Sequence, residues 1–302
     1  TLFTRLWALA GAVLAGLLIP AAAAAAAFSS GVWLEFTAPL FAAVLAFVLA
    51  VFMNYRVEGR QKRFIRQVFN HYLSGHVIER IIAEPDRLKL GGEQREVSSF
   101  FSDVAGFTSI SEGLSPEELV QMLNRYLSEM SDIILKSGGT LDKYEGDAII
   151  AFWNAPLDQS NHAFLACRSA LECQKRLQEL RPEFAETFGH EIHARIGINS
   201  GPAVVGNMGS ETRFDYTAMG DTINLASRLE GACKAYGILT LVGEQTQGQV
   251  SDKILTREVD LIKVVGKTRP VRVYELIGMR DEGSTKRERE SEQVEEALGL
   301  YR

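Results

Sequence analysis

The order of strand-like and helix-like segments between residues 93 and 277 constrains the fold more than any other feature of the sequence. A first strand-like run ends at Val104. A helix with a 3.6-residue apolar period begins after the capping box of Ser115 and Glu118 and stops at Gly138. A strand–helix–strand–strand–helix–strand order predicts a ferredoxin-like α/β sandwich of the α+β class. The later predicted segments are a hairpin at 140–153, helices at 160–180 and 221–235, and strands at 193–198, 203–205, 239–242, 254–264 and 271–276.

Composition narrows the classes of protein to which the chain can belong. Its 302 residues include 32 basic and 38 acidic side chains, which gives a net charge of −6. This acidic balance argues against nucleic acid as a partner, because proteins that bind it usually present a basic patch. The three cysteines form no CxxC pair, so neither a disulfide scaffold nor a cysteine zinc site is expected. A reducing compartment fits best.

The first 54 residues contain only two charged side chains, Arg5 and Glu35. Two apolar runs, at about 6–28 and 32–53, are each long enough as a helix to span a hydrocarbon core of about 30 Å. Basic residues crowd the end of the second run and are absent from the loop, which predicts cytoplasmic outer ends. We therefore expect a multi-pass protein of the cell inner (plasma) membrane, in contact with lipid and with its main domain in the cytoplasm. A buried hairpin in a soluble protein is the alternative.

Two further segments flank the main domain, which is predicted over residues 91–278. Residues 55–90 indicate a juxtamembrane helical linker, either a simple amphipathic connector or a short parallel coiled coil that pairs two chains. Residues 279–302 are rich in charge and are expected to form a solvated, disordered tail. Because residue 1 is Thr rather than Met, an upstream sensor segment is expected to be missing from this sequence.

Two aspartates are candidates for metal ligands. Asp103 ends the first strand, and Asp147 lies at the turn of the predicted hairpin. If the two strand ends are neighbours, their carboxylates can share Mg²⁺, which usually takes one or two carboxylates together with substrate phosphates. The peptide groups that follow Asp103 and enter a turn through Gly106 can cradle a polyphosphate. Taken alone, an aspartate in a hairpin turn is usually only a turn former.

Three separated motifs stand in an order that resembles the class III nucleotide cyclase family, the adenylate and guanylate cyclases. They are residues 100–108, the hairpin that contains Lys143 and Asp147, and residues 213–230. The resemblance covers about residues 90–277. Together with the expected membrane hairpin, it is similar to the bacterial membrane-bound adenylate cyclases.

The resemblance implies a role for each matched residue. Asp103 and Asp147, with Val104 beside them, correspond to the metal-binding positions, which hold two Mg²⁺ or Mn²⁺ ions per active site. Asn224 and Arg228 match the pair that orients the ribose and stabilises the transition state. The implied substrate contacts are Lys143 and Thr217 at the purine, Arg195 at the triphosphate, and Phe107 and Thr108 after the first aspartate.

The residues at the purine positions favour adenine. Adenine offers an acceptor at N1 and a donor at N6, whereas Lys143 supplies only donors and the hydroxyl of Thr217 can accept. Guanine offers donors at N1 and N2 and would need a carboxylate in place of Lys143. The family's commoner adenylate pattern has Asp at position 217, and Thr is typical of a bacterial-type subset.

The predicted function is therefore that of an adenylate cyclase in membrane-linked signal transduction. The ribose 3′-oxygen of ATP attacks the α-phosphate, which yields 3′,5′-cyclic AMP and pyrophosphate. In this family one catalytic domain supplies the metal aspartates and a second supplies the purine lysine and the Asn–Arg pair. Since this chain contains both sets, the resemblance implies a homodimer with two shared active sites.

Two alternatives of a different class remain. The domain could be a catalytically silent cyclase-like module that serves only in dimerisation or sensing, or the chain could be a membrane receptor or scaffold. The intact set of five polar residues argues against a silent module, which has no physical need of these groups together. They are Asp103, Lys143, Asp147, Asn224 and Arg228.

Overall fold

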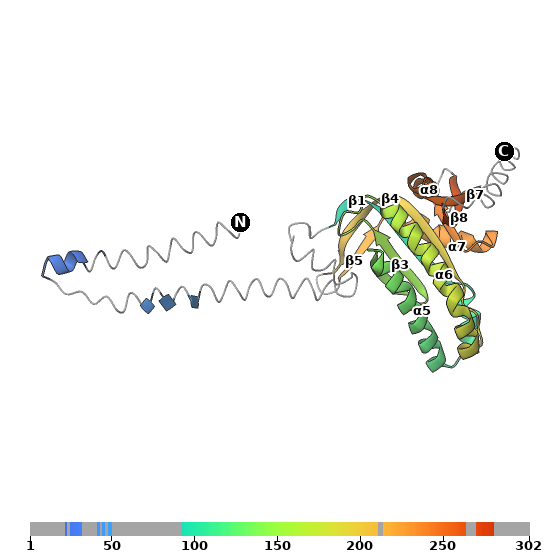
Figure 1. The fold of residues 1–302 in the computed structure, drawn as a ribbon, viewed down its shortest axis with the longest axis horizontal. Coiled ribbons are helices and arrows are strands. Elements are labelled where there is room, and N and C mark those ends of the chain that lie inside the picture. The colour runs from blue at the N-terminus through green and yellow to red at the C-terminus, as the bar shows by residue number, and fades with distance from the viewer. Residues whose placement is uncertain are drawn as a thin grey trace. The chain divides into compact units, whose positions relative to one another are not determined.

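The computed structural model describes residues 22, 25–31, 41–42, 44–45, 48–49, 92–210, 214–263 and 270–280. The chain divides into two units, Thr1–Val68 and Phe69–Arg302, and the strands and helices below belong to the second. In chain order (Figure 1) they are β1 (Glu93–Val104), α4 (Phe107–Gly113), α5 (Pro116–Lys136), β2 (Thr140–Glu145), β3 (Ala148–Trp153), α6 (His162–Phe188), β4 (Ala194–Gly209), β5 (Phe214–Met219), α7 (Asp221–Tyr236), β6 (Thr240–Gly243), α8 (Glu244–Val250), β7 (Ile254–Ile262) and β8 (Val271–Met279).

One eight-stranded sheet forms the centre of this unit. Its strands run in the order β2-β3-β1-β4-β6-β8-β7, and β5 pairs with β4 beyond that path. The pairs β2–β3, β3–β1 and β1–β4 are antiparallel, and β4–β6 is parallel. The half built from β1 to β4 therefore has the strand order 2-3-1-4 that a ferredoxin-like sandwich requires, and the expectation of a mixed α+β domain is confirmed.

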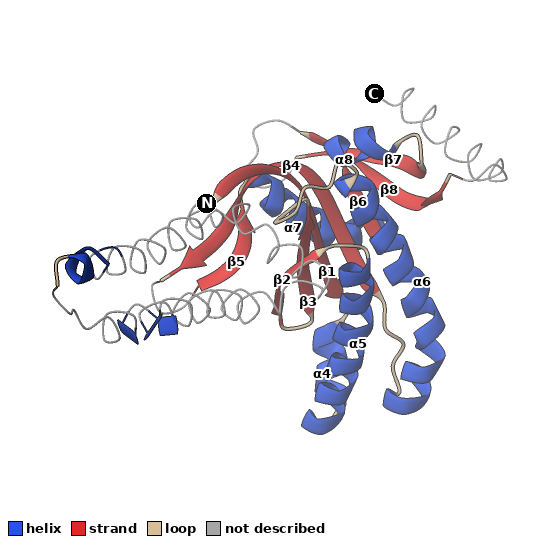
Figure 2. Cartoon of the chain, turned by 60° about the vertical axis from the view of Figure 1, so that its left-hand side comes forward, coloured by secondary structure: helices blue, strands red, loops and turns tan. Residues whose placement is uncertain are grey.

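Helices cover both faces of the sheet. On β6, Leu241 packs into a cluster with the buried face of α7, whereas the next residue, Val242, packs into the larger cluster that contains α5 and α6. Neighbouring residues of a strand point to opposite faces, so α7 lies on one side and α5 with α6 on the other. Figure 2 shows α5 and α6 side by side on the same face of the sheet. Gly197 of β4 leaves room for the close approach of α7, because a Cβ there would meet the backbone of Ala226 and Glu230.

The helix α5 begins and buries its side chains as the sequence predicts. The hydroxyl of Ser115 accepts from the backbone of Glu118, the Glu118 carboxylate accepts from the backbone of Ser115, and Pro116 occupies the first turn. Three residues of the apolar face that the 3.6-residue period predicts are fully buried, and four others pack at the edge of that face or continue it. The buried ones are Met122, Tyr126 and Met130; Leu119, Leu123 and Ile133 are partly buried, and Ile134 completes the buried face.

The prediction of two short strands at 193–198 and 203–205 is wrong, because the structure has one long strand, β4. Gly201 and Pro202 interrupt the apolar pattern but not the pairing with β1, where Glu96 lies opposite Pro202. The missing N–H of Pro202 is tolerated because it lies between the part of β4 that pairs with β6 and the part that pairs with β5. The short helices α4 and α8 and the strand β5 were not predicted as elements.

The expectation of a multi-pass protein of the inner membrane is corrected by the structure. Within the residues described, no helix combines the length and the apolar character needed to cross a membrane. A span needs about 20 apolar residues in one helix, and the longest helical stretch described within the first 54 residues is 25–29. Most of the two predicted spans, about 6–28 and 32–53, lies outside the described residues. So do the linker at 55–90 and nearly all of the tail at 279–302.

Candidate active site

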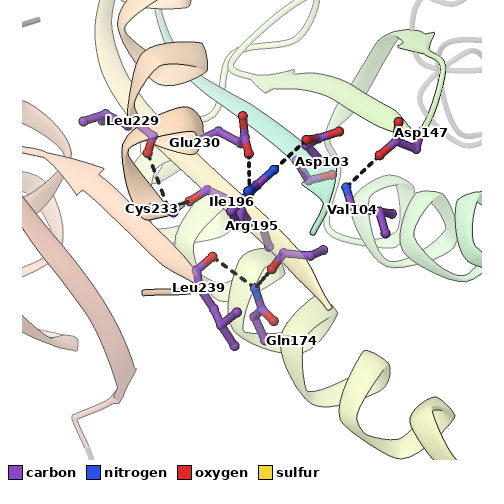
Figure 3. Close-up of polar contacts among 12 residues, drawn as sticks. Asp103, Val104, Asp147, Gln174, Arg195, Ile196, Leu229, Glu230, Cys233 and Leu239 are labelled. Atoms are coloured by element: carbon purple, nitrogen blue, oxygen red, sulfur yellow. Dashed lines mark hydrogen bonds and ion pairs between the residues drawn. The ribbon is translucent and has the colours of Figure 1, made fainter. Parts of the chain in front are cut away.

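Two aspartates meet where β1 ends beside the β2–β3 turn. Asp103 is the penultimate residue of β1, and Asp147 follows Gly146 in the turn of the hairpin. Because β3 pairs with β1 along their length, the hairpin turn reaches the end of β1, and the backbone N–H of Val104 donates to Oδ2 of Asp147 at 2.9 Å. Figure 3 shows the two carboxyl groups on either side of the Val104 backbone. The two strand ends are thus neighbours in the structure, as predicted.

Burial and the neighbouring carboxyl group change the acidity of Asp147. Burial, followed by the influence of the Asp103 carboxyl, raises the pKa of Asp147 to about 6. A third carboxyl group, Glu230 of α7, shares the guanidinium of Arg195 with Asp103, and burial followed by the charge of Asp103 raises the pKa of Glu230. Carboxylates that crowd in this way are relieved by a bound cation, and oxygen ligands suit Mg²⁺ and Mn²⁺. The two aspartates and the adjacent Val104 backbone therefore fit a divalent metal.

The described residues contain no cluster of three or more His, Cys, Asp or Glu side chains suited to a metal. A site built from Asp103 and Asp147 would accordingly take its remaining oxygens from backbone, water and substrate phosphate. Mg²⁺ commonly binds in that way.

Arg195 of β4 connects this site to α7. Its Nη2 lies 2.8 Å from Oδ2 of Asp103, and its Nε lies 3.0 Å from Oε1 of Glu230 (Figure 3). Asp103 and Arg195 are direct partners in the β1–β4 register, which explains why their side chains meet. Arg195 therefore lies in the candidate site, as expected, but within one chain its guanidinium is engaged by two carboxylates.

The two residues expected at the purine are joined by a third. The Thr217 hydroxyl on β5 donates to Oδ2 of Asp142 at 2.6 Å, and Nζ of Lys143 lies 3.6 Å from Oδ1 of the same carboxylate. Asp142 is only 4% exposed, and burial raises its pKa, whereas the Thr217 hydrogen bond and the Lys143 charge act in the opposite direction. Strands that are far apart in the sequence thus bring Lys143 and Thr217 together through a buried carboxylate.

Asn224 and Arg228 lie one turn apart on α7, and so on one face of that helix. That face is directed away from the buried residues Leu225 and Leu229; Asn224 is exposed and Arg228 is half-buried. No hydrogen bond or ion pair joins either side chain to another residue in the described part of the chain. Both are thus available to a ligand or to a second chain.

Phe107 and Thr108 form the first turn of α4, directly after Gly106. Gly106 has a φ of 75°, a left-handed conformation that glycine adopts without strain, and it allows β1 to turn sharply into the helix. No side chain caps this helix, and the backbone N–H groups of Ser109 and Ile110 donate to the carbonyl of Gly106. The contact of Phe107 and Thr108 with a nucleotide stays a prediction.

Sequence reasoning missed two residues of the site, Asp142 and Glu230. Asp142 precedes Lys143 in a strand-like run, and Glu230 is the last residue of the motif at 213–230. Both lie next to residues that the sequence singled out, but no pattern indicated a role for either. Only the β2–β5 contact and the packing of α7 on β4 reveal their partners.

Residues 92–278 match the family model described as the adenylate and guanylate cyclase catalytic domain. The chain belongs to this family. The match coincides with the sheet and helices described above, and its range includes both aspartates, Lys143, Thr217 and the Asn–Arg pair.

Similar proteins include cyclases of both base specificities. "Adenylate cyclase 1" of Rhizobium meliloti is 40% identical over 186 residues, which are 62% of this chain and 28% of that protein. The chain thus spans much less than half the length of this curated relative. The crystal structure of the adenylyl cyclase CyaB from P. aeruginosa has a TM-score of 0.60 at 38% identity, covering 64% of this chain and 99% of that one. The guanylyl cyclase Cya2 has a TM-score of 0.58 at 34% identity, with coverages of 64% and 98%.

Proposed function

We propose that this protein is an adenylate cyclase that converts ATP to 3′,5′-cyclic AMP and pyrophosphate. The observation that carries the proposal is the pair Asp103 and Asp147, held at the end of β1 within a domain of the cyclase family. Membership of the family alone is compatible with either base, since similar proteins include a guanylyl cyclase. The choice of adenine rests on Lys143 and Thr217, whose donor and acceptor groups match N1 and N6 of adenine.

The reaction breaks the O–H bond of the ribose 3′-hydroxyl, whose proton passes to solvent, and forms a bond between the 3′-oxygen and the α-phosphorus. It also breaks the bond from that phosphorus to the bridging oxygen, which leaves with pyrophosphate. The protein has little covalent chemistry to perform, so positioning and charge stabilisation dominate. Arg228 stabilises negative charge at the α-phosphate, and Asn224, one turn earlier, orients the ribose. The planar fork of arginine suits two phosphate oxygens better than a lysine ammonium does.

Asp103 and Asp147, with the carbonyl of Val104, would hold two Mg²⁺ or Mn²⁺ ions per site. When bound, these ions supply activation of the 3′-hydroxyl and neutralisation of phosphate charge. The polar surroundings of the two carboxylates support this assignment, because Arg195 and the Val104 N–H already fix one oxygen of each. A metal-ligating carboxylate usually has its orientation fixed by such contacts.

We further propose that a homodimer forms two shared sites. Asn224 and Arg228 point away from the core of their own chain, which leaves them available to a nucleotide bound at the aspartates of a second chain. Two-fold symmetry then makes both sites equivalent.

The first experiment measures nucleotide turnover by the full chain with Mn²⁺, supplied with ATP or GTP, beside Asp147→Ala. We expect the parent to form cyclic AMP from ATP and only little cyclic GMP from GTP. We expect Asp147→Ala to form no cyclic AMP. Absence of any cyclic product from a dimeric parent would contradict the proposal and favour a silent module. Cyclic GMP as the main product would refute the base assignment.

A mixing experiment tests the shared site. Asp103→Asn and Arg228→Ala are each expected to be inactive alone. A mixture that exchanges subunits regains one intact site in each mixed dimer, or about a quarter of the parent activity. A mixture that forms mixed dimers and stays inactive would contradict a site built from two chains.

A further inference from the structure

The strand β2 contains an irregularity at the residue before Lys143. Leu141 lies opposite Ala151 of β3 and Lys143 lies opposite Ile150, so Asp142 between them has no partner and forms a bulge. A bulge re-aims a side chain relative to the regular alternation of a strand, and bulges are frequent next to active sites. Here the bulged residue is a carboxylate that is 4% exposed and reaches β5.

The contacts of this carboxylate fix the direction of one hydrogen atom. An ionised carboxylate only accepts hydrogen bonds, so the 2.6 Å contact with Asp142 Oδ2 requires that Thr217 Oγ1 donates to it. The lone pairs of Thr217 Oγ1 then remain for a ligand. The second oxygen, Oδ1, lies 3.6 Å from Nζ of Lys143 and holds the ammonium beside the same hydroxyl by ion pairing.

We propose that Asp142 is a specificity-determining positioning residue, which holds the Thr217 hydroxyl as an obligatory acceptor and the Lys143 ammonium as a donor at the purine edge. This inference rests on the proposed function, since it concerns the base chosen by that site. Adenine satisfies both groups, because its N6 amino group donates and its N1 accepts. Guanine conflicts with both, because its O6 faces the lone pairs of Thr217 and its N1–H faces the donors of Lys143.

The variant Asp142→Asn changes this arrangement without changing the shape of the side chain. Lys143 attracts the amide oxygen of the asparagine to the Oδ1 position, so the NH₂ group faces Thr217 and donates to it. The Thr217 hydroxyl is then free to donate to O6 of guanine. We expect the ratio of kcat/KM for ATP to kcat/KM for GTP to fall about tenfold, the value of one hydrogen bond of the wrong polarity.

A double-mutant cycle with Thr217→Val separates this role from a general effect on the site. Thr217→Val removes the hydroxyl, so it should lower the ATP-to-GTP ratio by itself, and Asp142→Asn should then change the ratio less than about twofold further. In Thr217→Ser, which keeps the hydroxyl, Asp142→Asn should again produce the tenfold fall. Asp260→Asn is the matched control, because Asp260 accepts from the hydroxyl of Tyr236 at 2.7 Å in a hydroxyl–carboxylate pair on β7 and α7.

An unchanged ATP-to-GTP ratio in folded Asp142→Asn would overturn the inference, and so would an equal fall in the Thr217→Val background. An unchanged ratio in folded Thr217→Val would also overturn it, whether or not Asp142→Asn folds, because the Asp142 carboxylate is proposed to act through the Thr217 hydroxyl. A parent that makes no cyclic nucleotide refutes the proposed function instead. In that case the same ratio, taken from equilibrium binding of non-reacting ATP and GTP analogues, decides whether Asp142 governs base choice.

Discussion

Replacing Asp147 by asparagine is expected to stabilise the metal-free protein while abolishing turnover. In the parent the pKa of Asp147 is about 6 against an ordinary 3.8, so its ionised form is disfavoured by the fold. A difference of this size corresponds to at most about 3 kcal/mol at pH 7.5. Because Asp103 beside it has a third of its side chain exposed, solvent screening reduces the expected gain to about 1–2 kcal/mol. An asparagine oxygen still accepts from the Val104 N–H.

The sign of the pH dependence follows from the raised pKa. Between pH 4 and pH 6 the folded parent binds the proton that the unfolded chain has released. Its stability therefore falls as pH rises through this range. The asparagine variant lacks this loss, so its advantage over the parent is present at pH 7.5 and shrinks progressively toward pH 4.

Thermal unfolding in EDTA at pH 7.5 and pH 4.5 measures this difference. For a domain of this size we expect the Tm of Asp147→Asn to exceed that of the parent by about 2–6 °C at pH 7.5 and by clearly less at pH 4.5. Mn²⁺ should then raise the Tm of the parent and not that of the variant. Asp132→Asn, an exposed position on α5, is the control and should change little. An equal or lower Tm for Asp147→Asn at pH 7.5 would refute the reasoning.

Three further outcomes are expected. Arg228→Lys should lower kcat about a hundredfold with KM for ATP little changed, because a point charge does not replace the guanidinium fork; steady-state kinetics measure this, and a raised KM with unchanged kcat would contradict it. Gly197→Ala should destabilise the protein by about 1–3 kcal/mol in urea unfolding, because the new Cβ meets the backbone of α7 at Ala226; an unchanged midpoint would show that the approach of α7 is not tight. The thiols should resist iodoacetamide in the folded protein at pH 7.5 and react in urea, as mass spectrometry would detect, because all three are buried and burial raises the pKa of Cys167 and Cys233 to about 12.

The parts of the fold that local chemistry determines could be predicted. The capping box fixes the start of α5, and the turn at 145–147 between two apolar runs defines the hairpin that carries Asp147. Pairing between distant strands could not be read in the same way. The apolar pattern breaks at Gly201 and Pro202, and only the continuous register with β1 makes β4 a single strand.

For the candidate site too, local motifs could be predicted from the sequence, whereas contacts between distant strands could not. Asp103, Lys143 and Asp147 stand in recognisable motifs. The structure brings Asp103 and Asp147 together, as expected for residues at neighbouring strand ends. Asp142 could not be assigned a partner from sequence, because period-two alternation does not reveal a bulge. Its partner Thr217 is 75 residues away.

Lys143 and Asp147 belong to one hairpin, four residues apart at the end of β2 and the following turn. In the proposed dimer, the Asp147 of a given hairpin serves one active site while its Lys143 serves the other. A displacement of that hairpin when nucleotide binds at one site therefore changes metal binding there and base recognition at its neighbour. The two sites are then energetically coupled, and the dependence of rate on ATP concentration should depart from a simple hyperbola.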